Sequence, residues 1–278
     1  MFSKVYVEIT NTCNLSCPFC HGTKRAPRRM TEEEFSVVAE KLKGHTRYIY
    51  FHVLGEPLTH PQLCALLRIA AEKGFNSCIT TNGFLLPDKA DTLYAAERLY
   101  RLSVSLHSFE ANGGRSGLRE YLDGVWEVCT RLAEKGSYCV LRLWNEGGIN
   151  SLNGEITAYL REKTGGEWEK ARNDSLRIAK NIYLESAAKF DWPDVNESER
   201  SVQFCYGLRD QIAILCDGTV VPCCLDADGS IALGNIFESS LDAILSGDRA
   251  RAMYAGFSER RCTEELCRRC GFAERFSL

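Results

Sequence analysis

Hydrophobic and polar residues alternate at the start of the chain, and similar segments recur at regular intervals. Val5, Val7 and Ile9 alternate with Tyr6, Glu8 and Thr10, the period-two pattern of a strand. Later segments of this kind are separated by helix-like segments, three of which end just before a glycine. The pattern predicts further strands at 48–53, 76–80, 101–106, 138–144 and 181–185, and helices at 31–43, 61–73, 89–98, 118–135 and 156–163.

Strands that alternate with helices predict a parallel sheet with right-handed crossovers. Six repeats are too few for a closed eightfold barrel, so we expect an α/β fold with an open, partial (β/α)6 barrel of TIM type over residues 1–190. In such a fold the functional groups gather at the carboxyl ends of the strands.

The pattern changes after a polar segment, 187–201, that contains Pro193. Two short strands at 211–215 and 219–221, joined through Cys216-Asp217-Gly218, predict a hairpin, and a helix is expected at 240–253. Half of the 14 cysteines lie from Cys205 onward. We therefore expect a second, small β-hairpin/helix domain over residues 191–278.

Composition narrows the class of protein. The 278 residues are 45% hydrophobic and 26% charged, as in ordinary globular proteins, and a net charge of -3 gives no reason to expect nucleic acid as a partner. No apolar run is long enough for a membrane span, and the chain enters a strand without a signal peptide, so we expect a cytoplasmic protein without a membrane partner. The cysteines cluster in short spacings, which favours reduced thiols that hold metal over disulfides.

Three cysteines, Cys13, Cys17 and Cys20, lie within eight residues just after the first strand. Soft thiolates select iron-sulfur clusters, zinc or copper, and three of them would leave one iron of a four-iron cluster unligated. A zinc site would need a fourth ligand, such as His21. Burial as small apolar residues is a third alternative, which the polar loop and Pro18 disfavour.

The spacing C-x3-C-x2-C after a first strand resembles the radical S-adenosylmethionine (SAM) superfamily. The resemblance implies a 4Fe-4S cluster on these three cysteines, with SAM bound to the fourth iron and Phe19 beside its adenine. Leu54-Gly55-Glu56-Pro57 is similar to the Gly-Gly-Glu-Pro turn of the family, whose carbonyls and acid receive the methionine ammonium group. Leu54 stands where the family has the first glycine of this turn, so Gly55, Glu56 and Pro57 are the matching residues.

Four further residues are cofactor contacts by the same resemblance. Asn82 belongs to Thr81-Asn82-Gly83, which is also typical of a plain tight turn. Ser105 matches a polar position near the cofactor carboxylate. Arg142 and Asn145 could contact the carboxylate and ribose, although a salt bridge to a neighbouring helix explains Arg142 equally well. His107 is either a core histidine or a substrate contact.

The C-terminal cysteines resemble the auxiliary-cluster domain of this superfamily, in its short (twitch) or long (SPASM) version. The resemblance implies one auxiliary 4Fe-4S cluster on Cys205, Cys223, Cys267 and Cys270, hence two clusters in the chain, or three if the longer version applies. Cys224 competes with Cys223, Cys262 could replace a terminal ligand, and Cys216 is unassigned; structural zinc is the alternative. We expect the cysteines inside regular elements to be core residues: Cys64, Cys78, Cys129 and Cys139.

The resemblance implies a radical SAM oxidoreductase that draws electrons from an external donor such as flavodoxin or ferredoxin. It would cleave SAM to a 5'-deoxyadenosyl radical, abstract a substrate hydrogen and oxidise the substrate radical through the auxiliary cluster. No leader-binding module precedes Val5, which favours a small molecule such as a sugar or aminocyclitol. The alternatives are a peptide-modifying enzyme and a non-catalytic iron-sulfur or zinc protein.

Overall fold

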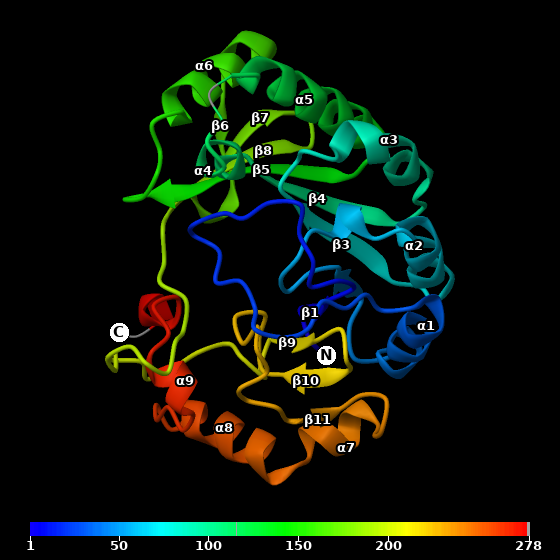
Figure 1. Ribbon diagram of the computed structural model, residues 1–278, viewed down its shortest axis with the longest axis vertical. Helices are drawn as coiled ribbons and strands as arrows, with labels where there is room; N and C mark the ends of the chain where they lie inside the picture. Colours follow the sequence, from blue (N-terminus) through cyan, green and yellow to red (C-terminus); the bar gives the residue numbers. More distant parts are fainter. Residues whose placement is uncertain (115, 277–278) are drawn as a thin grey trace.

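The centre of the molecule is a twisted sheet whose parallel strands follow the predicted strand-helix order (Figure 1). The computed structural model describes residues 1–114 and 116–276. Within this part of the chain, neighbouring strands pair in parallel from β1 through β5 to β8. These strands are β1 (Lys4–Val7), β2 (Tyr48–Tyr50), β3 (Asn76–Thr81), β4 (Leu99–Ser105), β5 (Tyr138–Glu146) and β8 (Ile182–Ala188). The predicted partial barrel is confirmed.

Helices cover the outer face of this sheet, as Figure 1 shows along its right and upper rim. The first one begins at a capping box, in which Thr31 accepts from the Glu34 backbone and the Glu34 side chain accepts from Thr31. Apolar faces of the helices and of the strands form one large core. The helices are α1 (Glu32–Lys41), α2 (Leu63–Glu72), α3 (Leu86–Ala95), α4 (His107–Ala111), α5 (Leu118–Glu134) and α6 (Asn153–Thr164).

The C-terminal hairpin continues the barrel sheet. Strand β9 (Gln211–Ile214) pairs in parallel with β1, and β10 (Thr219–Val221) and β11 (Gly234–Asn235) follow in antiparallel order. Since β1 would otherwise be the edge of the barrel, β9 satisfies its free backbone groups. The hairpin was predicted, but its pairing with β1 was not.

Several elements differ from the pattern-based expectation. A hairpin of β6 (Glu169–Lys170) and β7 (Leu176–Ala179) adds antiparallel strands beyond β8. The single helix expected at 240–253 is two, α7 (Leu241–Leu245) and α8 (Asp248–Ser258), which break at Ser246 and Gly247, and α9 (Glu265–Arg268) follows.

The inner and outer faces of the barrel sheet differ in chemistry. Outward positions such as Val5, Ile49 and Leu102 are fully buried under the helices. Inward positions alternate with them and include Glu8, Ser103 and Ser105, so polar groups gather where the strands enclose space. No helix among the described residues is long and apolar enough to cross a membrane.

The expectation for the cysteines of regular elements holds for three of the four. Cys78, Cys129 and Cys139 are buried, but Cys64 is exposed. Cys64 lies on α2 one position after buried Leu63, on the face away from buried Leu66. A helix turns by about 100° per residue, which carries the side chain of Cys64 to the solvent side.

Candidate active site

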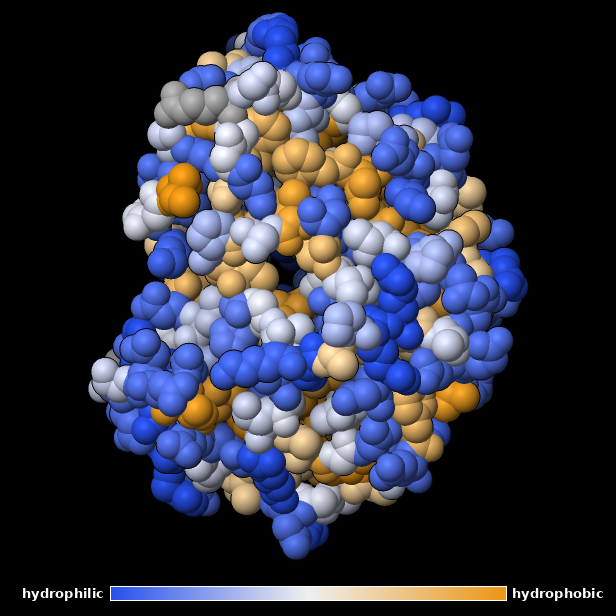
Figure 2. Space-filling view, viewed as in Figure 1, coloured by the Kyte–Doolittle hydropathy of each residue, from blue (hydrophilic) through white to orange (hydrophobic). Residues whose placement is uncertain are grey.

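A pocket of about 310 Å³ opens at the carboxyl ends of the barrel strands and is lined by Cys13, Cys17 and Cys20. The loop that carries them leaves β1 and returns to α1, in the middle of the view in Figure 1. In the same view, Figure 2 shows a small hollow near the middle of the molecular surface. Cys13 and Cys20 are exposed and Cys17 is half-buried. The structure therefore places the three predicted ligands in the lining of one pocket, which has an ordinary ligand-binding size.

Amide groups donate hydrogen bonds to the sulfurs of this loop. The Leu15 backbone N lies 3.4 Å from Cys13 Sγ, and Asn112 Nδ2 lies 3.1 Å from Cys17 Sγ. Asn112 also accepts from the Ser16 backbone N at 3.1 Å, which fixes the loop to the end of α4. Such donors stabilise thiolate charge and tune cluster potentials. Asn112 was not predicted as a contact of this loop, because the short helix α4 was not predicted.

The turn after β2 packs directly against the backbone of the cysteine loop. Gly55 has φ of 74°, and a Cβ there would lie 2.4 Å from Thr10 O and 2.9 Å from Thr12 O. Only glycine fits this approach. The backbone N of Glu56 then donates to Thr12 O at 2.9 Å. The resemblance to the Gly-Glu-Pro turn thus has a structural reason, the close contact between two loops.

The Glu56 carboxylate is buried beneath the pocket and oriented by backbone groups. It accepts from Asn82 N at 2.7 Å and from Leu58 N at 3.0 Å, and it lines the pocket. Burial raises the pKa of Glu56 to about 7, although these hydrogen bonds act in the opposite direction. A buried carboxyl with such a pKa is suited to a cationic partner such as an ammonium group.

Aromatic residues form another part of the pocket. Phe19 lines it and packs on His107, with ring centroids 4.8 Å apart. Trp192, from the segment after β8, lines the pocket and donates from Nε1 to Phe19 O at 3.0 Å. The polar segment was interpreted only as a linker, but its Trp192 holds the cysteine loop in place.

The other predicted contacts divide into two groups. Asn82 and Ser105 line the pocket, whereas Pro57, Arg142 and Asn145 do not. Pro57 starts a short 3-10 turn behind Glu56, and Asn145 donates to Ile149 O and Asn153 Oδ1. His52, which also lines the pocket, was missed. His52 lies on the inward face of the segment that begins with β2, together with Tyr48 and Tyr50. The spacing of two residues between these positions could have predicted this placement.

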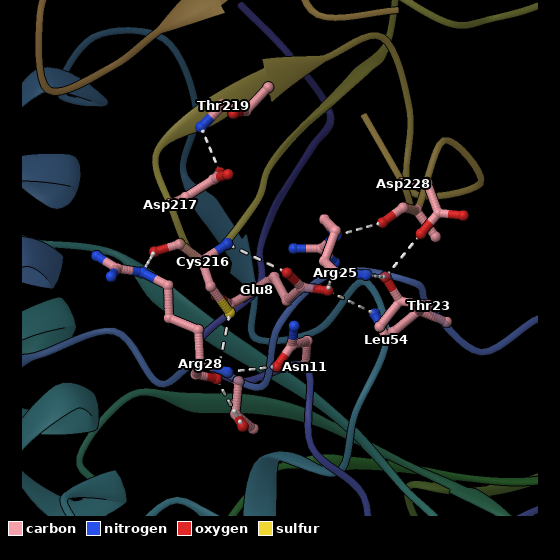
Figure 3. Close-up of polar contacts among 12 residues, drawn as sticks. Glu8, Asn11, Thr23, Arg25, Arg28, Leu54, Cys216, Asp217, Thr219 and Asp228 are labelled. Carbon is pink, nitrogen blue, oxygen red and sulfur yellow. Dashed lines mark hydrogen bonds and ion pairs between the residues drawn. The ribbon is translucent and has the colours of Figure 1, made fainter. Parts of the chain in front are cut away.

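A buried carboxylate, Glu8, which directly follows β1, joins the cysteine loop to the C-terminal hairpin (Figure 3). The side chain is 0% exposed and pairs with Arg25 at 2.7 Å. It also accepts from Leu54 N at 3.3 Å and from Cys216 N at 3.1 Å. One side chain therefore connects the cysteine loop, the turn after β2 and the loop that follows β9.

The loop makes further contacts with the C-terminal region in the same view (Figure 3). Arg28 Nε donates to Cys216 O at 2.8 Å, and Thr23 Oγ1 donates to Asp228 at 2.7 Å. The backbone N of Lys24 donates to the same Asp228 oxygen at 3.2 Å. The two cysteine-bearing parts of the chain are thus fixed to each other.

A second cavity is lined by Cys205, Cys223, Cys267 and Cys270, the four cysteines predicted as auxiliary ligands. Apolar side chains such as Leu225 and Leu266 complete its wall. Burial raises the pKa of Cys223 strongly and that of Cys270 to about 11, and neighbouring thiols add to both effects. Several thiols around one cavity suit an iron-sulfur cluster, because the thiols lose their protons when they bind iron.

The remaining C-terminal cysteines lie elsewhere. Cys216 is buried and donates from Sγ to Glu8 O at 3.0 Å, and Cys224 contacts Tyr6 of β1. Neither lines the cavity. Cys262 hydrogen-bonds Cys267 and remains an alternative ligand. Residues 1–114 and 116–276 contain no group of three His, Cys, Asp or Glu side chains arranged for a metal ion; the thiols spread over the walls of two pockets.

Comparison with family models agrees with both sites. The model of the radical SAM superfamily matches residues 7–150, and that of the SPASM iron-sulfur cluster-binding domain matches residues 205–271. The first range contains Cys13, Cys17 and Cys20, and the second contains all four thiols of the second cavity. The cofactors of these families are 4Fe-4S clusters and SAM.

Individual relatives are more distant. The chain is 38% identical to a GTP 3',8-cyclase of Chlorobaculum tepidum over 56% of its length and 48% of that protein, and so spans about half of such curated relatives. It is 23% identical to the sporulation killing factor maturation protein SkfB of Bacillus subtilis over 92% of its length and 67% of SkfB. The structure of BtrN in complex with AdoMet and 2-DOIA has a TM-score of 0.55 at 17% identity, covering 97% of this chain and 93% of BtrN.

Proposed function

The chain belongs to the radical SAM superfamily and carries a SPASM domain, and we propose that it oxidises its substrate by way of an auxiliary cluster. The observation that supports this function is the placement of the cysteines. Three thiols line an open pocket beside a buried acid, and four others enclose a separate cavity.

In this proposal Cys13, Cys17 and Cys20 hold the cluster that binds SAM. When bound and reduced, the group supplies a 5'-deoxyadenosyl radical that removes a hydrogen atom from the substrate. Glu56 and the Gly55 backbone receive the methionine ammonium group. Asn82 and Ser105 orient the rest of the methionine, Phe19 packs on the adenine, and Pro57 supports the turn from behind.

Cys205, Cys223, Cys267 and Cys270 hold one auxiliary cluster in this proposal. Four thiolates leave no iron free for a substrate, which favours electron transfer over substrate binding. A cluster held there would accept one electron from the substrate radical, which would lose one proton to a base or water, so the product would be two hydrogens lighter. The electron then returns to an external carrier such as a flavodoxin or ferredoxin. Reduced, clustered thiols also support a cytoplasmic location.

A small molecule, such as a sugar or aminocyclitol alcohol, is the leading substrate class. The likeness to BtrN supports it, since that fold matches over 93% of its length and its structure contains 2-DOIA. The first test is anaerobic reconstitution with dithionite and SAM. Formation of 5'-deoxyadenosine is expected, and its absence would reject catalysis in favour of an iron-sulfur or zinc binding protein.

A peptide substrate is the second candidate, because SkfB is related over 92% of this chain and is a maturation protein. The two candidates differ in product mass. Dehydrogenation or crosslinking lowers the mass by two hydrogens, whereas epimerisation leaves it unchanged. An unchanged mass would reject the oxidation step while leaving SAM cleavage intact.

A further inference from the structure

Two arginines and a single acid lie side by side on the inner face of the barrel sheet. Arg142 on β5 is paired in register with Ser105 of β4 and with Glu185 of β8. Arg101 lies four residues before Ser105, on the same face of β4. Ser105 lines the cofactor pocket, so this charged group lies next to a residue of the pocket wall.

The two guanidinium groups differ in their partners. Arg101 donates to Glu185 at 2.9 Å and from Nε to Ser103 Oγ at 3.1 Å. Within the described part of the chain, Arg142 Nε makes only a long ion pair with Glu185 Oε2, at 3.6 Å, and is buried without a hydrogen-bond partner. Among the described residues, the side chain of Arg142 has no hydrogen-bond acceptor, although it is only 13% exposed. Buried donors are normally paired.

The surroundings hold the Arg142 guanidinium in place without neutralising it. It stacks over the ring of Trp144 at 4.5 Å. Burial, and the charge of Arg142, lower the pKa of His52 to about 3, so His52 is neutral. Burial raises the pKa of Tyr6 and Tyr50, which are neutral too. One carboxylate therefore faces two guanidinium groups, and one positive charge is left over.

We propose that Arg142 binds an oxyanion of the substrate, a carboxylate or phosphate, in the barrel below the cofactor pocket. The proposal rests on the proposed function and specifies its substrate class. A guanidinium stacked on an aromatic ring presents planar donors that match such an anion in a bidentate manner. The leftover positive charge disfavours a cationic aminocyclitol and favours a sugar acid, a sugar phosphate or the carboxylate of a peptide.

The cofactor also has a carboxylate, which is a second source of the same chemistry. Arg142 does not line the pocket where Glu56 and the three thiols would hold SAM, whereas Ser105 and Asn82 do. The cofactor carboxylate therefore has nearer polar partners, which leaves Arg142 for the substrate.

The test compares acetate with acetamide, which have nearly the same shape but differ in charge. Both are added together, at equal concentration, to reconstituted protein saturated with SAM, and saturation-transfer NMR reports binding of each methyl group. We expect acetate to bind roughly tenfold more tightly than acetamide, as for hydrogen bonds to a charged group. Arg142→Gln should abolish this preference, whereas Arg119→Gln, at a surface arginine that pairs with Glu162, should keep it.

Further variants separate recognition from folding and from cofactor binding. Arg142→Met removes a buried charge whose only carboxylate partner at the described positions, Glu185, keeps its closer pair with Arg101, so the thermal midpoint of the apoprotein should stay the same or rise; a clear fall would show a structural role and overturn the proposal. Equal binding of acetate and acetamide by the wild type, or weak binding of both, would overturn it too. If Arg142→Gln weakens SAM binding as much as acetate binding, the anion is that of the cofactor. Formation of 5'-deoxyadenosine is scored separately, so failure of cleavage rejects the proposed function and leaves the anion result standing.

Discussion

The two cysteine groups of this chain differ in both number and exposure. The N-terminal group has three thiols on a loop at the pocket mouth, two of them exposed. The C-terminal group has four thiols around a cavity, each at least half-buried. Three thiolates leave one iron of a cubane open to a ligand, whereas four close it. In the proposed function this difference separates two tasks, SAM cleavage at the site with three thiols and electron transfer at the site with four.

The largest effect is expected at the open site. Cys17→Ala removes one of three ligands, and formation of 5'-deoxyadenosine should fall to background while the absorbance of the auxiliary cluster remains. Cys64→Ala, at an exposed cysteine on α2, is the control and should keep full activity. Cleavage that survives in Cys17→Ala would mean that the two sites do not divide their tasks in this way.

Removing ligands from the closed site should lower the iron content and stop product formation, but SAM cleavage should continue. Replacing Cys267 and Cys270 together by Ala should lower the iron content from about eight to about four per chain and stop formation of the oxidised product. Iron analysis and mass spectrometry measure the two effects. Cys224→Ala is the control, because Cys224 faces Tyr6 and not the cavity, and its iron content should not change. About twelve irons in the wild type would indicate two auxiliary clusters.

The contacts of Glu8, which join the cysteine loop to the C-terminal region, should contribute to the stability of the fold. Glu8→Gln leaves Arg25 without its buried partner, so the free energy of unfolding should fall by about 3 kcal/mol. The control, Glu162→Gln, breaks an exposed pair with Arg119 and should cost less than about 1 kcal/mol. Denaturant unfolding of the two variants measures the difference; equal losses would mean that the Glu8 contacts do not hold the two regions together.

The smallest effect is a pH dependence confined to the open site. Because burial raises the pKa of Glu56 to about 7, the carboxyl is protonated below that pH and must lose its proton to bind an ammonium group. SAM affinity should therefore fall about tenfold per unit below pH 7 and level off above it. The stability of the apoprotein should change with pH in the opposite direction to SAM affinity. The contribution of Glu56 to stability is present in acid and is lost as the pH rises through 7. Titration calorimetry should show weak, pH-independent binding for Glu56→Gln; an unchanged slope would assign the proton to another group.

Hydrophobic periodicity predicted the elements that are long enough to show a clear period. The strands of the partial barrel and the turn at Gly55 and Glu56 follow from alternation and from short spacings. The β6 and β7 strands are too short to show a period, and β9 finds β1 only through tertiary pairing. Local periodicity contains no information on such distant partners.

Site residues divide in the same way. The cysteines were found because their spacing is itself the signal. Asn112 and Trp192 act from irregular segments, and their contacts with Cys17 and Phe19 depend on how those segments fold back. The sequence analysis considered Arg142 as a cofactor contact or a salt-bridge partner, but only the structure shows that it shares Glu185 with Arg101, which is the closer of the two.

The pairing of β1 with β9 has a consequence for the order of folding. Strand β1 leaves the ribosome well before its second neighbour, β9, which is synthesised about 200 residues later, roughly 10 to 40 s at ordinary rates of translation. During that interval the nascent barrel has a bare edge at β1, the kind of surface that pairs with other chains. Contacts of such long range also slow folding. The nascent chain is therefore exposed to aggregation through the edge of β1 until β9 has been synthesised.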